Sequence, residues 1–245
     1  MQRFRPAHTM PIVTERMDTE FMLLQLNDAA FPIGAYSHSF GLETYVQREL
    51  VKDAPTAESF VRNRLEYSLQ YYEALCARLA YEAAVGESAE KLLRLEGILS
   101  SARVPAEIRS ANKKMGQRFL KTLISAGMLE EKPGFLKQYL EGAAEMGTSQ
   151  CILYGIVCWL CSVPEERMLS NYIYAQTSAM VVNCVKLIPL SQNAGQEILF
   201  RCQELMRRVE ENVRKLTLAD VALSTPGFDI RCMQHETLYS RLYMS

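Results

Sequence analysis

A helical repeat of apolar side chains between residues 56 and 85 is the feature that most restricts how this chain can fold. Apolar residues recur there at steps of three or four with charged residues between them, which is the pattern of an amphipathic α-helix. Similar patterns return along most of the chain, and no segment of convincing length alternates as a β-strand does. The repeat consists of Val61, Leu65, Leu69, Tyr72, Cys76 and Leu79.

These patterns predict an all-α protein, a single globular bundle of about eight to ten helices. Prolines and glycines separate the helical segments; Pro105, for example, opens one helix and Gly127 is placed to end it. The first residues are polar and mixed, which is typical of a mobile arm. The predicted units are an arm at 1–17, a helical domain at 18–225 and a C-terminal tail at 226–245.

The most apolar run, CILYGIVCWLCSVP, begins at Cys151. At roughly 14 residues it is too short to span a bilayer, so we expect a buried central helix. No apolar secretory signal is present near the start, and the odd number of cysteines indicates reduced thiols, so we expect a cytoplasmic protein without membrane contact. Cys158 and Cys161 have C-x-x-C spacing, but the lack of a cationic neighbour argues against a redox role.

Sequence motifs for catalysis are scarce. The chain has no phosphate-binding G-x-x-x-x-G-K-[ST], no H-E-x-x-H and no G-x-S-x-G. Ser37 and His38, with Glu43 nearby, invite a hydrolase interpretation, yet adjacent residues of a helix do not face each other. We therefore predict that the protein is not an enzyme, and keep a hydrolase based on Ser37, His38 and Glu43 as an alternative.

Three residues are candidate metal ligands: His38, Cys232 and His235. Imidazole and thiolate suit nickel, copper or zinc, but these residues come from separate segments without a clear fourth ligand. We favour an interpretation in which His38 forms a hydrogen bond at the start of a helix. No firmly bound metal or cofactor is expected.

A basic stripe runs along residues 103–121, with Glu107 as its only acidic residue. A solvated helix face is the first interpretation, and an acidic protein partner is the second. A helical nucleic-acid-binding protein is a further alternative, although the chain's net charge of -1 and the scarcity of aromatic residues on the stripe argue against it. The stripe consists of Arg103, Arg109, Lys113, Lys114, Arg118 and Lys121.

Two segments have the composition of binding surfaces. The signature segment, FPIGAYSHSFGLE at residues 31–43, combines a Pro-Gly turn with aromatic residues ahead of a short helix. The tail contains apolar residues at helical spacing and ends in LYMS. Such side chains need burial, so the tail either packs on its own domain or folds onto a partner.

These two segments also carry a resemblance. The signature segment resembles the P-I-G-x-[FY]-[ST]-H-S-F-G-L-E signature of UreF-type urease accessory proteins, and MQHETLYSRLYMS resembles the family's C-terminal H-E-x-L-x-x-R-L-[FY]-x-S. Two internal segments, ANKKMGQRFLKTL and YIYAQTSAMVVNCVKLIPLSQNAGQEIL, also resemble family segments. One departure is Ala35, where many members have glycine; it restricts only the backbone.

The resemblance implies an all-α homodimeric scaffold that binds a UreD/UreH-type accessory protein and recruits the UreG-type GTPase. The assembly would deliver nickel to apo-urease. We expect the tail to become ordered with the partner and to lie beside the signature segment, with Arg241 near Tyr36. The predicted partner-binding residues are Pro32, Gly34, Tyr36, His38, Ser39, Phe40, Glu43, His235, Glu236, Leu238, Arg241, Leu242 and Tyr243.

Overall fold

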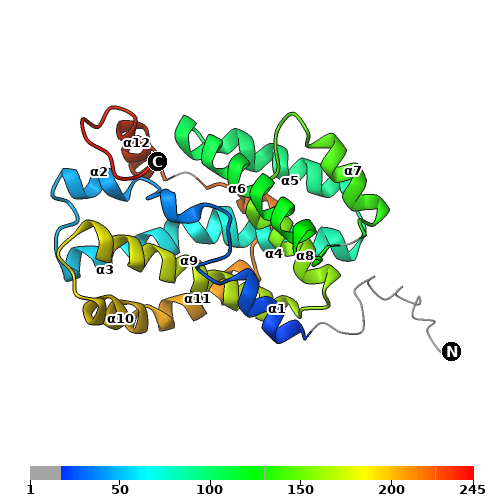
Figure 1. Ribbon diagram of the computed structural model, residues 1–245, viewed down its shortest axis with the longest axis horizontal. Helices are drawn as coiled ribbons and strands as arrows, with labels where there is room; N and C mark the ends of the chain where they lie inside the picture. Colours follow the sequence, from blue (N-terminus) through cyan, green and yellow to red (C-terminus); the bar gives the residue numbers. More distant parts are fainter. Residues whose placement is uncertain (1–17, 130, 224) are drawn as a thin grey trace.

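The computed structural model describes residues 18–129, 131–223 and 225–245, and the arm predicted at 1–17 lies outside them. Within the described residues the secondary structure is helical, without strands, which confirms the all-α prediction (Figure 1). The α-helices are α1 (Thr19–Leu26), α2 (Leu42–Gln47), α3 (Ala54–Arg64), α4 (Leu75–Val85), α5 (Ala89–Ala102), α6 (Ala106–Ser125), α7 (Gly134–Gly142), α8 (Gln150–Leu160), α9 (Glu165–Leu187), α10 (Gln192–Arg201), α11 (Gln203–Val213) and α12 (Pro226–His235). Short 3₁₀ turns lie at η1 (Ala35–Ser37) and η3 (Leu218–Asp220).

The helix predicted at 56–85 is longer than its apolar repeat. It begins at Ala54, after the N-cap residue Asp53. The Asp53 side chain accepts a hydrogen bond from the Thr56 backbone N–H, and the Thr56 side chain accepts one from the Asp53 N–H, which is a capping box. A π-helical segment, η2 (Leu65–Ala74), joins α3 to α4 in one continuous helix. Counted this way, the described residues form eleven α-helices, slightly more than predicted. Ser191 caps the start of α10, and Cys202 separates α10 from α11.

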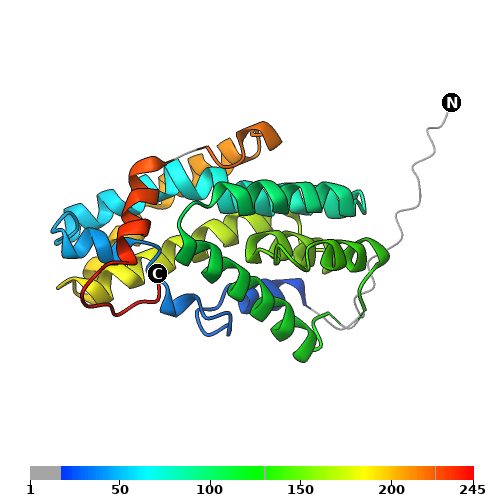
Figure 2. The ribbon, with the colours of Figure 1, turned by 90° about the horizontal axis from the view of Figure 1, so that it is seen from above.

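The predicted central helix is α8. Every residue of α8 except Trp159 is buried, and the helix packs against α4, α6 and α9 (Figure 2). Gly155 allows the closest approach, because a Cβ there would lie 2.1 Å from the backbone oxygen of Ala77 in α4. None of the helices in the described ranges combines the length and apolar content needed to cross a membrane.

The tail packs on its own domain instead of standing apart. Helix α12 lies across α2 at one end of the bundle, and the last ten residues curl back toward the signature segment (Figures 1 and 2). Cys232 on α12 contacts the turn at Gly41, where an added Cβ would lie 2.7 Å from the Cys232 Sγ. Of the two possibilities left open by the sequence, the structure shows the first.

All seven cysteines are buried, and none forms a disulfide. Burial raises the pKa of Cys161, Cys184 and Cys232 to about 12. At pH 8 roughly one in ten thousand of these thiols is ionised, and the thiolate is the reactive form. We expect a thiol reagent such as Ellman's reagent to modify the native protein slowly, and all seven cysteines rapidly in guanidinium chloride. Rapid native modification of Cys161 would contradict this prediction.

Candidate functional site

The signature segment and the tail meet through backbone hydrogen bonds. The backbone oxygen of Ser245 accepts hydrogen bonds from the N–H groups of Ser39 (2.6 Å) and Phe40 (3.0 Å). In the same region the Met244 N–H donates to the Ser37 oxygen at 2.8 Å. The prediction that tail and signature segment lie together is therefore confirmed, although the two are separated by some two hundred residues of sequence.

Two glycines shape the signature segment for this contact. Gly34 and Gly41 have φ of 83° and 84°, a left-handed conformation that side chains disfavour. Both are also packed closely, since a Cβ at Gly34 would lie 2.3 Å from the Arg118 Nη1 of α6. The two glycines thus allow the signature segment to make two turns, one packed against α6 and one packed against α12.

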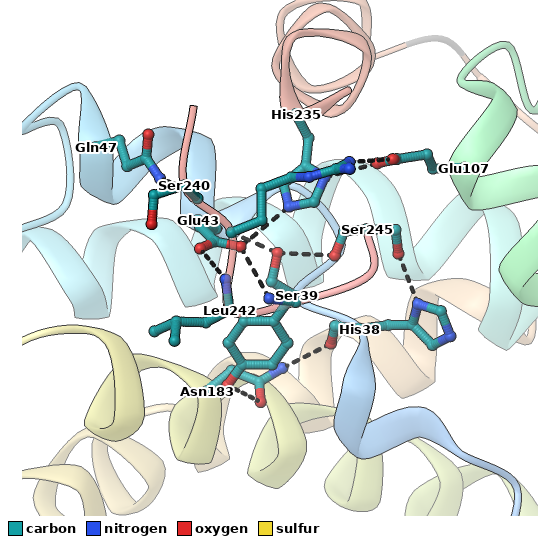
Figure 3. Close-up of polar contacts among 12 residues, drawn as sticks. His38, Ser39, Glu43, Gln47, Glu107, Asn183, His235, Ser240, Leu242 and Ser245 are labelled. Atoms are coloured by element: carbon teal, nitrogen blue, oxygen red, sulfur yellow. Dashed lines mark hydrogen bonds and ion pairs between the residues drawn. The ribbon is translucent and has the colours of Figure 1, made fainter. Parts of the chain in front are cut away.

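Glu43, in the first turn of α2, holds the tail from inside the protein. Its side chain is 4% exposed. One carboxylate oxygen accepts the Leu242 N–H at 2.7 Å, and the other accepts the Tyr243 N–H at 3.1 Å. The second oxygen also lies 3.1 Å from the His235 Nε2. A single buried carboxylate therefore binds both the end of α12 and the extended part of the tail (Figure 3).

His235 connects this carboxylate to α6. The ring is completely buried, and its Nδ1 lies 2.6 Å from the Glu107 Oε2. The other Glu107 oxygen accepts a hydrogen bond from the Arg241 Nη1 at 2.7 Å. The imidazole ring therefore lies between one carboxylate of α2 and one of α6 (Figure 3).

His38 has a structural role at the other end of the tail. Its Nδ1 lies 2.8 Å from the Ser245 Oγ, and its backbone oxygen accepts the Asn183 side-chain N–H at 3.1 Å. Asn183 in turn accepts the Tyr243 hydroxyl at 3.2 Å. Burial lowers the pKa of His38, as do the positive charges of Lys114 and Arg118. His38 follows η1 and is not at the start of a helix, so that detail of the prediction was wrong.

The residues of the hydrolase alternative have separate partners. The Ser37 hydroxyl donates to the Gly34 oxygen at 2.8 Å, His38 bonds Ser245, and Glu43 binds the tail. The structure does not bring Ser37, His38 and Glu43 together as a nucleophile, a base and an orienting carboxylate.

The candidate metal ligands do not form a cluster either. Both ring nitrogens of His235 contact carboxylates, and the raised pKa of Cys232 disfavours its thiolate. Among the described residues no group of three or more His, Cys, Asp or Glu side chains is arranged to hold a metal ion.

The predicted partner-binding residues divide into three groups by burial. The buried set holds the tail in place: Gly34, His38, Ser39, Glu43, His235 and Tyr243. Phe40 and Leu238 are half-buried. The exposed set faces solvent around the docked tail: Pro32, Tyr36, Glu236, Arg241 and Leu242. The Arg241 Nη1 donates a hydrogen bond to the Glu107 Oε1 at 2.7 Å.

Sequence reasoning missed three residues of this network. Glu107 is the only acidic residue of the basic stripe, and this was the one sequence feature that could have marked it as a residue with a specific partner. Asn183 on α9 binds His38 and Tyr243, and Gln47 donates to the Ser240 oxygen at 2.6 Å. Neither residue carries a sequence pattern that points to the tail.

The basic stripe is narrower than predicted. The Arg103 side chain is buried, pairs with Glu73 at 3.0 Å and lies over the Tyr72 ring. Arg109 donates to the backbone oxygen of Arg103 at 2.9 Å. These two arginines therefore stabilise the junction before α6, and Lys113, Lys114, Arg118 and Lys121 remain along the helix.

Comparison with known proteins gave two findings. A model of the UreF family matches residues 51–203. A urease accessory protein UreF from Bacillus sp. (strain TB-90) is 34% identical over 231 residues, covering 94% of this chain and 100% of that protein. The second match extends over nearly the whole of the present chain, beyond the region of the family model.

Proposed function

This chain belongs to the UreF family of urease accessory proteins, and on that basis we propose that it is a non-enzymatic scaffold for nickel insertion into apo-urease in the cytoplasm. In this role it joins a UreD/UreH-type accessory protein and recruits a UreG-type GTPase. Nickel is the cargo of the assembly and not a resident cofactor of this chain.

The observation that supports the proposal is the exposed surface around the docked tail. Leu242 is 80% exposed, although the next residue, Tyr243, is held by a hydrogen bond to Glu43. Tyr36 is 73% exposed, although the next residue, Ser37, accepts a backbone hydrogen bond from Met244. Tyr239 and Met244 are also exposed in the tail. Large exposed apolar side chains on an ordered backbone are typical of binding sites, because little conformational entropy is then lost when the partner binds.

We assign the two partners to two parts of this surface. The apolar tail residues Leu242 and Met244 suit the UreD/UreH-type protein. Tyr36 and Arg241 suit the GTPase, because the guanidinium retains further N–H donors beyond the one that binds Glu107. We also propose a homodimer, which would cover exposed apolar side chains away from the tail, such as Phe21, Leu24 and Phe200.

The test is a co-expression pull-down with the UreD/UreH-type protein and the GTPase, using two differently tagged copies of the chain. We expect Leu242→Ala with Met244→Ala to reduce capture of the UreD/UreH-type protein at least tenfold, because truncating one hot-spot residue costs about 2 kcal/mol and a tenfold loss corresponds to about 1.4 kcal/mol. Tyr36→Ala with Arg241→Ala should reduce capture of the GTPase. The second tag reports the homodimer in the same eluate.

A matched control is Val85→Ala, which truncates an exposed apolar residue at the end of α4. Unchanged capture by all variants would refute the assignment of these residues. Failure of the wild-type chain to capture either partner would refute the scaffold itself.

A further inference from the structure

Helix α6 exposes a row of cations that have no ion pair within the described part of the chain. Lys114, Arg118 and Lys121 are exposed and Lys113 is half-buried. None of the four lies within 4.0 Å of a described carboxylate, whereas Arg78, Arg201 and other cations across the protein form such pairs. The α6 row is therefore a positive surface that the described residues leave uncompensated.

An apolar groove runs beside this row. It has a volume of about 380 Å³ and lies between α6 and α7. Leu120 and Ile124 of α6 and Leu140 of α7 line the groove, together with small residues such as Ala143 and Gly147. Ile124 is 44% exposed, and Lys121 belongs to both the groove and the cationic row.

The two features form one surface because they share a helix. On α6, Lys114, Arg118 and Lys121 are three or four residues apart and lie on one face. Leu120 and Ile124 are next to that face. The charged residues on α7 and the turn after it are Lys137, Glu141 and Glu145, with a net charge of -1. The four cations of α6 outweigh this charge, so positive charge predominates around the groove.

We propose that this surface binds an acidic amphipathic helix of a protein partner. The apolar side of that helix occupies the groove, and its carboxylates face Lys114 and Lys121, as in other helix-in-groove complexes. Charge complementarity favours an acidic occupant over a second copy of this chain, whose net charge is only -1. A wall of Leu120 and Ile124 lacks the aromatic platforms that single-stranded nucleic acid uses.

This inference rests on the proposed function for its candidate partners, but it uses a surface separate from the tail. The probes are the purified UreD/UreH-type protein, the UreG-type GTPase and apo-urease, each tested by biolayer interferometry against the full chain. The variants are Lys114→Glu with Lys121→Glu, and Ile124→Ser. The matched control is Lys91→Glu with Lys215→Glu, which changes the net charge equally at two exposed lysines elsewhere.

We expect the α6 charge reversal to weaken binding of one probe at least tenfold at about 0.05 M salt, with a smaller difference at about 0.5 M. Ile124→Ser should weaken the same probe, and the control pair should not. Failure of wild-type chain to bind any probe would refute the scaffold and this inference together. Wild-type binding that both α6 variants retain would refute this inference alone.

Two other outcomes would also refute the proposal that this surface binds an acidic helix. A duplex RNA or DNA probe that loses binding on charge reversal, while the three proteins bind unchanged, would assign the surface to nucleic acid. A dimer that dissociates in light scattering on charge reversal, again with unchanged protein binding, would assign it to a second copy.

Discussion

A Gly155→Ala variant is expected to lose about 3 kcal/mol or more of its free energy of unfolding. The added Cβ would lie 2.1 Å from the Ala77 oxygen and 3.0 Å from the Tyr81 nitrogen, and both atoms belong to the backbone of α4. Backbone in a helix cannot move aside as a flexible side chain can, so α8 must separate from α4 along the centre of the core. Urea unfolding followed by circular dichroism would measure the change.

The chain provides its own control for helix propensity. Gly97 lies within α5, and a Cβ there would have no neighbouring atom within 4 Å. Gly97→Ala should therefore stabilise the protein by up to about 1 kcal/mol, because alanine favours the helix without a new clash. If both variants shifted the free energy of unfolding in the same direction, close packing against α4 would not be the reason that residue 155 is a glycine.

Local pattern was enough to predict most of the fold. The positions of helices followed from apolar periodicity and from residues such as Pro105 and Pro164, which precede α6 and α9 directly. The apolar run from Cys151 identified the central helix, because a helix that is apolar on all sides must be surrounded by others. These are properties of short segments and require no knowledge of distant contacts.

The network at the tail could not be predicted in the same way. Glu43 and His235 are 192 residues apart in sequence, and Glu107 comes from a third segment. The sequence indicated that the two end motifs are unusual, but not that six of the predicted partner-binding residues are buried. Arg103 shows the converse error: its place in a basic stripe suggested solvent, while Glu73 on the neighbouring helix provides a buried partner.

Glu43→Gln is expected to release the tail. The amide keeps one acceptor oxygen but replaces the other with an N–H₂ group, which would face a backbone N–H or the His235 ring. Breaking one member of a buried charged network typically costs about 3 kcal/mol or more, which corresponds to a roughly hundredfold larger open population. Hydrogen exchange of residues 236–245, measured by mass spectrometry, should therefore become about a hundredfold faster while α8 remains protected.

Glu236→Gln is the matched control, since Glu236 is an exposed carboxylate in the same part of the tail. It should leave exchange in the tail unchanged. The comparison also tests the link between the buried network and function, because a released tail must be ordered again on binding and so should capture the UreD/UreH-type partner more weakly. Fast tail exchange with full capture would show that the docked arrangement does not prepare the surface for its partner. Slow exchange in Glu43→Gln would show that the backbone contacts of Ser39 and Phe40 with Ser245 hold the tail without the carboxylate.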